Sequence, residues 1–481
     1  MSKPNILWFC TDQQRYDTIH ALGNASIRTP ALDALCARGV AFTRTYCQSP
    51  VCTPSRASFL TGLHPSSIHV NRNGNGYFPD GVPLVTTRLA QAGYYGGLIG
   101  KLHLASGYDG VEARRDDGYT EFYYSHSPVA GFGKGSDYLD WVVEQGSHPD
   151  EIFETGKDGQ YTRYRHDMPE HLHQSVWCAE RARSFIASRQ SEPGPWMLSI
   201  NTFDPHPPFD APAAYEARYD EKELPGPLFG PDDLQQQERL RKAYHGCKHP
   251  KAPDGETRRM MASYYGMIEL IDAQFGRIVD TLEKTGQLDN TIIIFMSDHG
   301  EMLGDHGLSQ KGCRFYEGAV RVPLIVSWPG GGVRKGEVND QLMALLDIAP
   351  TLCELTGVES GLMHGRSFAS LLTQPREEQS VHRTSVRSEY YDAVTERDER
   401  GEIAETKTPS LATMFCDGRY KLTVYHHIDE GELYDLETDP GEFDNLWNKP
   451  AYLELQTTLL KRSFDESMVI MDQGPPKVHP Y

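Results

Sequence analysis

Two apolar segments of this chain, each predicted to be a buried strand, end directly before polar pairs. The segments are residues 5–11 and 291–297, and the pairs are Asp12-Gln13 and Asp298-His299. Side chains at the carboxyl ends of parallel strands meet at one edge of a sheet, where α/β proteins bind ligands. Two carboxylates, an amide oxygen and an imidazole suit a hard divalent cation. A lone aspartate after a strand is more often a turn or cap residue, so a metal site needs support from other motifs.

A cysteine precedes a predicted short helix in the segment CTPSRASFLTG at residues 52–62. Proline is favoured in the first turn of a helix, so Pro54 predicts a helix over residues 54–60 whose N-terminus points at Cys52. The partial positive charge of that terminus favours negative charge at position 52. The alternative is an ordinary buried cysteine ahead of a helix, which is what most such segments contain.

Three further segments place basic side chains after predicted strands or beside the second polar pair. Lys101 and His103 follow a strand predicted over residues 94–100, and His206 lies between prolines after a strand predicted over 196–203. Lys311 stands four residues after Gly307. Basic residues after strands are often solvated surface groups, and a histidine between prolines can belong to a structural turn. Gathered in one place, the same groups would hold an anion.

Together these motifs resemble type I sulfatases, the formylglycine-dependent sulfatase family of the alkaline phosphatase superfamily. Cys52, Pro54 and Arg56 fit the signature C-x-P-x-R, and residues 100–103 fit G-K-x-H. The segments DHGE at 298–301 and GDHG at 304–307 resemble the metal-binding region of the superfamily. A K…YEG…RVP arrangement starting at Lys311, and LYDLETDPGEFDNL at 433–446, are also common in sulfatases. The resemblance covers residues 5 to about 329, with weaker support near the C-terminus.

The resemblance implies a role for each of these side chains. Formylglycine-generating machinery would oxidise Cys52 to formylglycine, whose hydrate is the nucleophile, and one divalent ion (Ca²⁺, or alternatively Mn²⁺) would sit beside it. The implied metal ligands are Asp12, Gln13, Asp298, His299 and residue 52 itself. The residues implied to act in catalysis with Cys52 are Arg56, Lys101, His103, His206 and Lys311, and Asn73 is expected to bind the anion. Either Lys311 or His206 would protonate the leaving alcohol, and His103 would help to release sulfate.

The resemblance implies the hydrolysis of small sulfate monoesters, most simply as an arylsulfatase. Most sulfatases have two acids where this chain has Asp12 and Gln13, and the Asp-Gln pair is similar to phosphonate monoester hydrolases and to some bacterial sulfatases. Lys101 and His103 differ from phosphonate monoester hydrolases, which have neutral hydroxyl side chains there. The alternatives are therefore a phosphonate monoester or phosphodiester hydrolase with the same nucleophile, and an inactive metal-binding relative.

Alternating strand and helix patterns predict an α/β fold with a large, mostly parallel central sheet flanked by helices, and the resemblance implies an alkaline-phosphatase-like sandwich. The main predicted helices cover residues 30–38, 85–91 and 260–284. We expect a catalytic domain over residues 1–375 and a C-terminal subdomain over 376–481. The latter should contain a small antiparallel sheet (strands near 385–390, 413–415 and 420–425), a helix near 451–464 and an extended tail at 474–481 that links subunits into a homo-oligomer.

The chain is acidic, with 47 Lys and Arg against 67 Asp and Glu and a formal charge of −20. This balance argues against nucleic acid and anionic membranes as partners, because both carry negative charge. It does not exclude an anionic substrate, which a local cluster of cations can bind. Residues 1–5 show no signal-peptide pattern, and the nine cysteines are odd in number without zinc-like spacing, so we expect a cytoplasmic protein.

Overall fold

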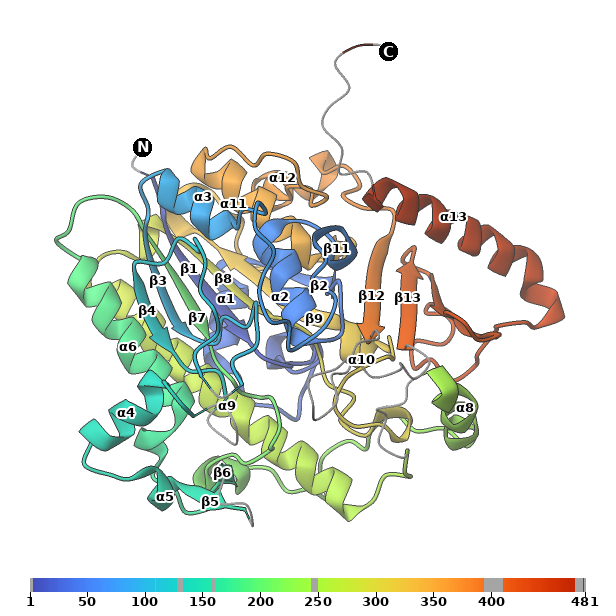
Figure 1. Cartoon of the computed structure of the whole chain (residues 1–481), viewed down its shortest axis with the longest axis horizontal. Coiled ribbons are helices and arrows are strands. Elements are labelled where there is room, and N and C mark those ends of the chain that lie inside the picture. The colour runs from blue at the N-terminus through green and yellow to red at the C-terminus, as the bar shows by residue number, and fades with distance from the viewer. Residues whose placement is uncertain are drawn as a thin grey trace.

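A nine-stranded, mostly parallel sheet forms the centre of the computed structural model (Figure 1). The structure describes residues 3–108, 110–127, 133–156, 161–243, 250–392, 410–471 and 479. In spatial order the strands are β10 (Glu337–Asn339), β2 (Val40–Tyr46), β9 (Arg321–Ser327), β8 (Thr291–Ser297), β1 (Asn5–Thr11), β7 (Trp196–Asn201), β3 (Tyr95–Gly100) and β4 (Glu121–Tyr124), with β11 (Met343–Ala344) paired to β2.

Strand β1 lies in the middle of the sheet and is parallel to both of its neighbours, β7 and β8. Within the described part of this sheet, β9 is the strand that runs antiparallel to both of its neighbours, β2 and β8. All seven residues of β1 are buried, as expected for a parallel strand covered on both faces. The prediction of a mostly parallel α/β sheet is confirmed, whereas β2 and its pairing with β9 were not predicted.

Helices cover both faces of the sheet, and the alternation of side chains along β1 separates two hydrophobic clusters. Ile6 and Trp8 belong to one cluster, and Leu7 and Phe9 belong to the other. The second cluster includes helices α1 (Pro30–Arg38), α6 (Gln174–Arg189) and α9 (Gly255–Lys284). The first includes α2 (Cys52–Thr61), α3 (Val85–Gln91), α11 (Ile348–Thr356) and α12 (Ala369–Thr373).

Helix α9 is the longest described helix and begins five residues before the predicted start at Met260. The prediction missed the cap: the Asp254 carboxylate accepts a hydrogen bond from the Thr257 backbone N–H at 3.0 Å. Such a cap satisfies amide donors that the first helical turn leaves without partners. Among the described residues, none of the helices has the length and apolar character needed to cross a membrane.

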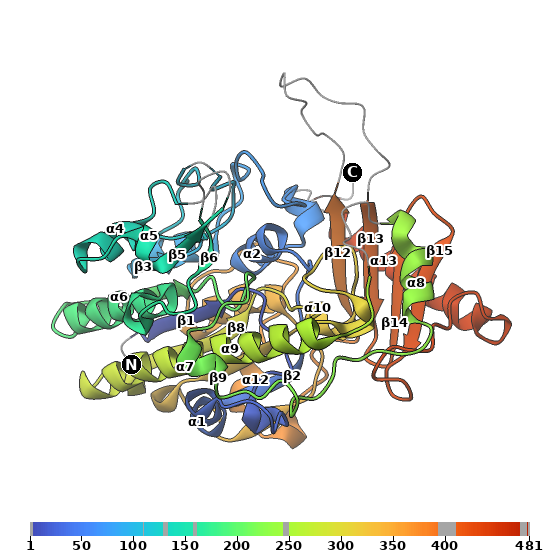
Figure 2. The same cartoon turned by 90° about the horizontal axis from the view of Figure 1, so that it is seen from below.

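A separate four-stranded antiparallel sheet lies at one end of the molecule, next to α10 (Figures 1 and 2). Its strands are β12 (Val386–Asp392), β13 (Ser410–Cys416), β14 (Tyr420–Tyr425) and β15 (Glu430–Asp435), and α13 (Leu453–Met471) packs against it. The predicted small antiparallel sheet is confirmed, with β15 as an additional strand. The expected tail at 474–481 lies, apart from residue 479, outside the described residues, so its role in oligomerisation stays a prediction.

The remaining described α-helices and strands are short. They are α4 (Asp137–Glu144), α5 (Pro149–Ile152), α7 (Ala213–Glu216), α8 (Asp233–Arg239), α10 (Glu317–Val320) and the antiparallel pair β5 (Phe153–Thr155) and β6 (Tyr161–Tyr164). Most of them fall within the two Gly- and Pro-rich stretches of the chain, between residues 108–164 and 210–253.

A buried ion cluster joins the small sheet to α10, which directly precedes β9 of the large sheet. Lys421 on β14 lies 3.0 Å from the Glu317 carboxylate on α10 and also contacts Glu442, and only 1% of the Lys421 side chain is exposed. Burial and Glu317 raise the pKa of Glu442 to about 7, although Lys421 opposes them. Lys421 therefore bridges two buried acids at this junction, and Arg321, 3.2 Å from Glu317, is a second cation beside one of them.

Replacing Lys421 by methionine should destabilise the protein, because Glu442 would stay buried without its cation and Glu317 would keep only Arg321. We expect a loss of about 3–5 kcal/mol in the free energy of unfolding, measured by urea denaturation. The loss should shrink as the pH falls through the region near 7, where Glu442 can take up a proton. Lys449→Met, which removes an exposed pair with Asp444, is the matched control and should cost less than about 1 kcal/mol. Equal losses in both variants would contradict this account.

Candidate active site

Position 52 is the first residue of helix α2, two residues earlier than the predicted start. The whole helix is buried, and it ends at Gly62, whose positive φ of 72° suits a residue without a side chain. In the first turn, the Thr53 N–H donates a hydrogen bond to the side-chain oxygen of Asn73 at 2.8 Å. The side chain of residue 52 therefore projects from a buried helix N-terminus, where negative charge is stabilised.

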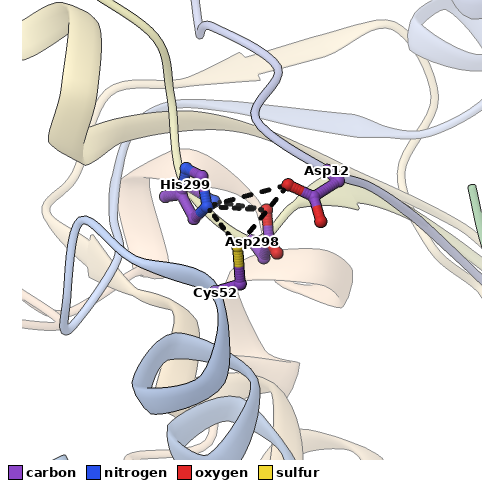
Figure 3. A group of neighbouring side chains, drawn as sticks. All are labelled: Asp12, Cys52, Asp298 and His299. Atoms are coloured by element: carbon purple, nitrogen blue, oxygen red, sulfur yellow. Dashed lines mark hydrogen bonds and ion pairs between the residues drawn. The ribbon is translucent and has the colours of Figure 1, made fainter. Parts of the chain in front are cut away.

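Four buried side chains converge at the carboxyl ends of β1 and β8 (Figure 3). Thr11 and Ser297 are register partners, which brings the next residues, Asp12 and Asp298, to the same edge of the sheet. With Cys52 and His299 they form a group whose ligand atoms all lie within 4.8 Å of one another. His299 Nε2 lies 3.2 Å from Cys52 Sγ, 3.7 Å from Asp12 Oδ1 and 3.8 Å from Asp298 Oδ1.

The tautomer of His299 fits a metal ligand. Its Nδ1 lies 3.0 Å from the Gly300 carbonyl oxygen, which can only accept, so Nδ1 carries the proton. The lone pair of Nε2 is then directed into the four-residue group, an arrangement typical of histidine ligands. Although burial disfavours the charged imidazole, Asp298 and Cys52 raise the pKa of His299, which indicates that the group attracts positive charge. These donors suit a divalent cation.

Two cations hold the carboxylates from the other side. Arg56 donates through Nε to Asp298 Oδ2 at 2.8 Å and lies 3.4 Å from Asp12 Oδ2 through Nη2. Lys101 Nζ contacts the same Asp12 oxygen at 2.5 Å. Burial works against ionisation of Asp12, yet Lys101, followed by His206 and Arg56, holds its pKa well below the usual range. Both aspartates therefore keep their Oδ1 atoms toward Cys52 and His299.

Gln13, predicted as a metal ligand, makes different contacts in this structure. Its side-chain oxygen accepts a hydrogen bond from Lys311 Nζ, and its Nε2 donates to the buried Glu301 carboxylate. Its backbone N–H donates to Asp298 Oδ1 at 3.0 Å. Gln13 thus links Lys311 to Glu301 through its side chain and contacts Asp298 through its backbone. Its role as a metal ligand stays a prediction.

His103 lies next to Lys101 in a loop that a buried carboxylate holds in place. Glu112 accepts hydrogen bonds from three successive backbone N–H groups, the first of them from His103 at 2.6 Å. The ring of His126 packs edge to face on that of His103, with centroids 4.2 Å apart. Burial and the neighbouring Lys101 lower the pKa of both imidazoles well below the ordinary value.

The sequence analysis did not identify Glu112 or His126. They reach the site from the loop after β3 and from the end of β4, in a Gly- and Pro-rich stretch that contains no recognisable motif. Burial of these two side chains cannot be predicted from the sequence, because residues in such a loop follow neither helical nor strand periodicity.

His206 and Lys311 lie near the same carboxylates. His206 Nδ1 lies 2.7 Å from the Pro207 carbonyl oxygen, so this nitrogen carries the proton and a neutral imidazole offers only a lone pair at Nε2. Burial, followed by Lys311, lowers the pKa of His206 well below the ordinary value despite the opposing charge of Asp12. For the Cys52 thiol, burial and Asp12 oppose ionisation, but Lys101, Lys311 and His299 outweigh them and lower its pKa.

Comparison with known proteins decides the family. The family model called Sulfatase matches residues 4–358, and the model for the C-terminal region of N-sulphoglucosamine sulphohydrolase matches residues 304–468. This chain belongs to the sulfatase family. The family expected from the sequence motifs is therefore confirmed. The relatives of this sulfatase indicate a hydrolase that acts on sulfate esters.

Two relatives and one solved structure illustrate the range of similar proteins. The arylsulfatase of Clostridium perfringens is 31% identical over 468 residues, covering 94% of this chain and 92% of the relative. The choline-sulfatase of Rhizobium meliloti is 30% identical over 474 residues, with 95% and 85% covered. The crystal structure of the phosphonate monoester hydrolase of Agrobacterium radiobacter has a TM-score of 0.80 at 24% identity, covering 99% of this chain and 100% of that one. This last similarity confirms the alkaline-phosphatase-like fold.

Removing the His299 imidazole should weaken binding of a divalent cation, because it takes away one of the converging donors. We expect His299→Ala to lower the affinity for Ca²⁺ and Mn²⁺ by at least about tenfold, measured by calorimetric titration of the metal-stripped protein. The control is His306→Ala, whose imidazole stacks on Tyr316 at 4.0 Å between ring centroids and is not one of the four grouped residues. An unchanged affinity in His299→Ala would exclude this site as the metal centre.

Proposed function

We propose that this sulfatase hydrolyses sulfate monoesters of the arylsulfatase type, with residue 52 as a formylglycine nucleophile beside one divalent metal ion. The observation that carries the proposal is the convergence of Lys101, Arg56 and the Asp12/Asp298 pair on a side chain at a buried helix N-terminus. Such a site stabilises negative charge on a nucleophile and on a bound anion. The similarity to the arylsulfatase of Clostridium perfringens supports it.

Residue 52 is a cysteine in the sequence, and the Sγ position stands in for an oxygen of the modified residue. As a formylglycine hydrate, residue 52 would supply one hydroxyl to attack sulfur, and loss of the proton from its second hydroxyl would re-form the aldehyde and break the C–O bond to sulfate. Asp12, Asp298 and His299 would hold the ion with residue 52, and Gln13 is a further candidate ligand. A bound cation would lower the pKa of the attacking hydroxyl and offset the charge of the substrate. Both Ca²⁺ and Mn²⁺ suit these donors.

Different side chains are suited to donate and to accept the protons of this reaction. In the tautomer imposed by Pro207, neutral His206 presents an unprotonated Nε2, so it is suited to orient the substrate and not to donate a proton. Lys311, which is held by Gln13, is therefore the better acid for the leaving alcohol. His103 has a lowered pKa and is neutral near pH 7, so it can accept the proton whose loss releases sulfate.

The preference for sulfate rests on the number of oxygens around the reacting atom. A sulfate monoester and a phosphonate monoester both carry one negative charge, but the first presents three non-bridging oxygens and the second two oxygens and one carbon. Lys101 and Lys311 are charged donors that act on position 52. A carbon facing one of these donors would leave it without a hydrogen-bond partner, which is costly in a buried site.

Hydrolysis of phosphonate monoesters is the second candidate function. It is favoured by Gln13 and by the similarity of the fold to a phosphonate monoester hydrolase. A catalytically inactive relative is a weaker alternative, because the charged groups of the site are brought together in the structure. The conversion of Cys52 by modifying machinery, the cytoplasmic location and the homo-oligomer remain proposals.

The discriminating measurement is kcat/KM for an aryl sulfate and for an aryl phosphonate monoester on one preparation whose residue-52 peptide has been checked by mass. We expect the sulfate to be preferred by at least about 100-fold, since the phosphonate carbon cannot accept the hydrogen bonds that the third oxygen accepts. The same leaving group in both esters serves as the internal control. A preference for the phosphonate would make the second candidate the correct one.

Replacing Cys52 by serine should abolish turnover while preserving the fold. Serine offers one hydroxyl for attack but no second hydroxyl from which to expel sulfate, so the variant should react at most once. We expect kcat to fall by at least about 1,000-fold, with intact-mass spectrometry showing at most one retained sulfuryl group per chain. Cys47→Ser, at a second buried cysteine outside the four grouped residues, is the matched control. Sustained turnover by Cys52→Ser would refute the formylglycine mechanism.

A further inference from the structure

A cavity of about 240 Å³ lies beside the proposed reaction site, between the catalytic part of the chain and the C-terminal sheet. Its wall contains Val51, Arg72, Asn73, Lys311, Tyr390 and Tyr391. No motif identified in the sequence accounts for Arg72 or for the two tyrosines, and the proposed reaction assigns them no task.

Contacts connect this cavity to the place where the ester bond would break. Val51 directly precedes residue 52 and is the N-cap of α2. Asn73 binds the Thr53 N–H through its oxygen, so only the NH₂ group of the same amide is available as a donor. Lys311, the proposed acid for the leaving alcohol, contacts Gln13 and also forms part of the cavity wall. An alcohol that takes a proton from Lys311 would therefore occupy this cavity.

The two tyrosines are fixed in place by their neighbour Glu389 on β12. The Glu389 backbone N–H donates to the Gln48 carbonyl oxygen at 2.9 Å, and its carboxylate accepts from the Ser66 N–H at 2.7 Å. These bonds attach β12 to the segments on either side of α2. Burial, and next Glu389, raise the pKa of Tyr391 to about 12, so its hydroxyl stays neutral. Successive side chains of a strand point to opposite faces, and Tyr390 belongs to the buried core, so Tyr391 is the tyrosine whose ring can face a ligand from this rigid strand.

The wall combines aromatic surface with positive charge. Aromatic rings stack favourably on tyrosine, and a guanidinium binds a carboxylate with particular strength. The described lining residues include the cations Arg72 and Lys311 and no carboxylate. An alcohol with a quaternary ammonium group would meet two like charges here. A volume of about 240 Å³ is enough for one ring.

We propose that this cavity binds the alcohol half of the substrate and selects a monocyclic aromatic alcohol that carries a carboxylate. Arg72 pairs with the carboxylate, Tyr391 contacts the ring, and Lys311 lies at the ester oxygen. This assignment rests on the proposed sulfatase function and adds the substrate class to it.

The test compares 4-carboxyphenyl sulfate with 4-carbamoylphenyl sulfate, which is nearly isosteric but neutral. The ratio of the two kcat/KM values is measured for the converted wild type and for Arg72→Gln, so the intrinsic reactivities of the esters cancel. We expect the ratio to fall by at least about tenfold in Arg72→Gln and to be partly retained in Arg72→Lys. Tyr391→Leu should raise KM for both esters and leave the ratio unchanged, because it removes ring contact and no charge.

Arg259→Gln is the matched control, since this arginine lies on α9, has an exposed side chain and does not line the cavity. Its ratio should equal that of the wild type. An unchanged ratio in Arg72→Gln, with both sulfates still hydrolysed, would overturn the cavity assignment and leave the proposed function standing. If the converted wild type hydrolysed neither sulfate, the proposed function would fail, and this assignment with it.

Discussion

The site depends on the contacts that Arg56 makes with two buried carboxylates. Asp12 and Asp298 come from neighbouring parallel strands, and two such acids side by side would repel each other and resist burial. Arg56 contacts both, and Lys101 neutralises Asp12 further. Arg56 and Lys101 thus balance the two acids, so a bound metal ion and Lys311 would make the site positive. This local positive charge would attract a negatively charged ester to a protein whose overall charge is −20.

The two sheets contribute different parts of the site. The carboxyl ends of β1, β3, β7 and β8 position the groups that act on the sulfuryl end, whereas β12 brings Tyr390 and Tyr391 to a neighbouring cavity. The Lys421 cluster attaches the small sheet to α10, and the Glu389 hydrogen bonds attach β12 to the segments on either side of α2. Because the alcohol-binding wall lies on a separate sheet, its side chains can vary without disturbing the metal site. The fold therefore does not specify the substrate.

The sequence predicted the residues that follow strands and missed those that arrive on loops. Asp12, Asp298 and Lys101 could be assigned to one edge because parallel strands end together, and the structure brings them together. Glu112 and His126 could not, since long loops carry no periodicity. Strand β2 was missed because Thr and Arg interrupt its apolar pattern where it is less buried. The start of α2 at Cys52, and not at Pro54, places the reactive side chain in the helix itself, which proline position alone does not determine.

Gln13 reconciles the two activities that the motifs leave open. An aspartate at this position would place a third carboxylate beside Asp12 and would pair with Lys311. The amide of glutamine instead accepts from Lys311 without cancelling its charge and donates to Glu301. The ammonium of Lys311 therefore keeps its full charge for the substrate oxygens. Because sulfate and phosphonate monoesters carry the same charge, this change benefits both of them, so Gln13 by itself does not indicate a phosphonate. Under the proposed function, the discrimination falls to the groups that donate hydrogen bonds to the non-bridging oxygens, and Lys101 is one of them.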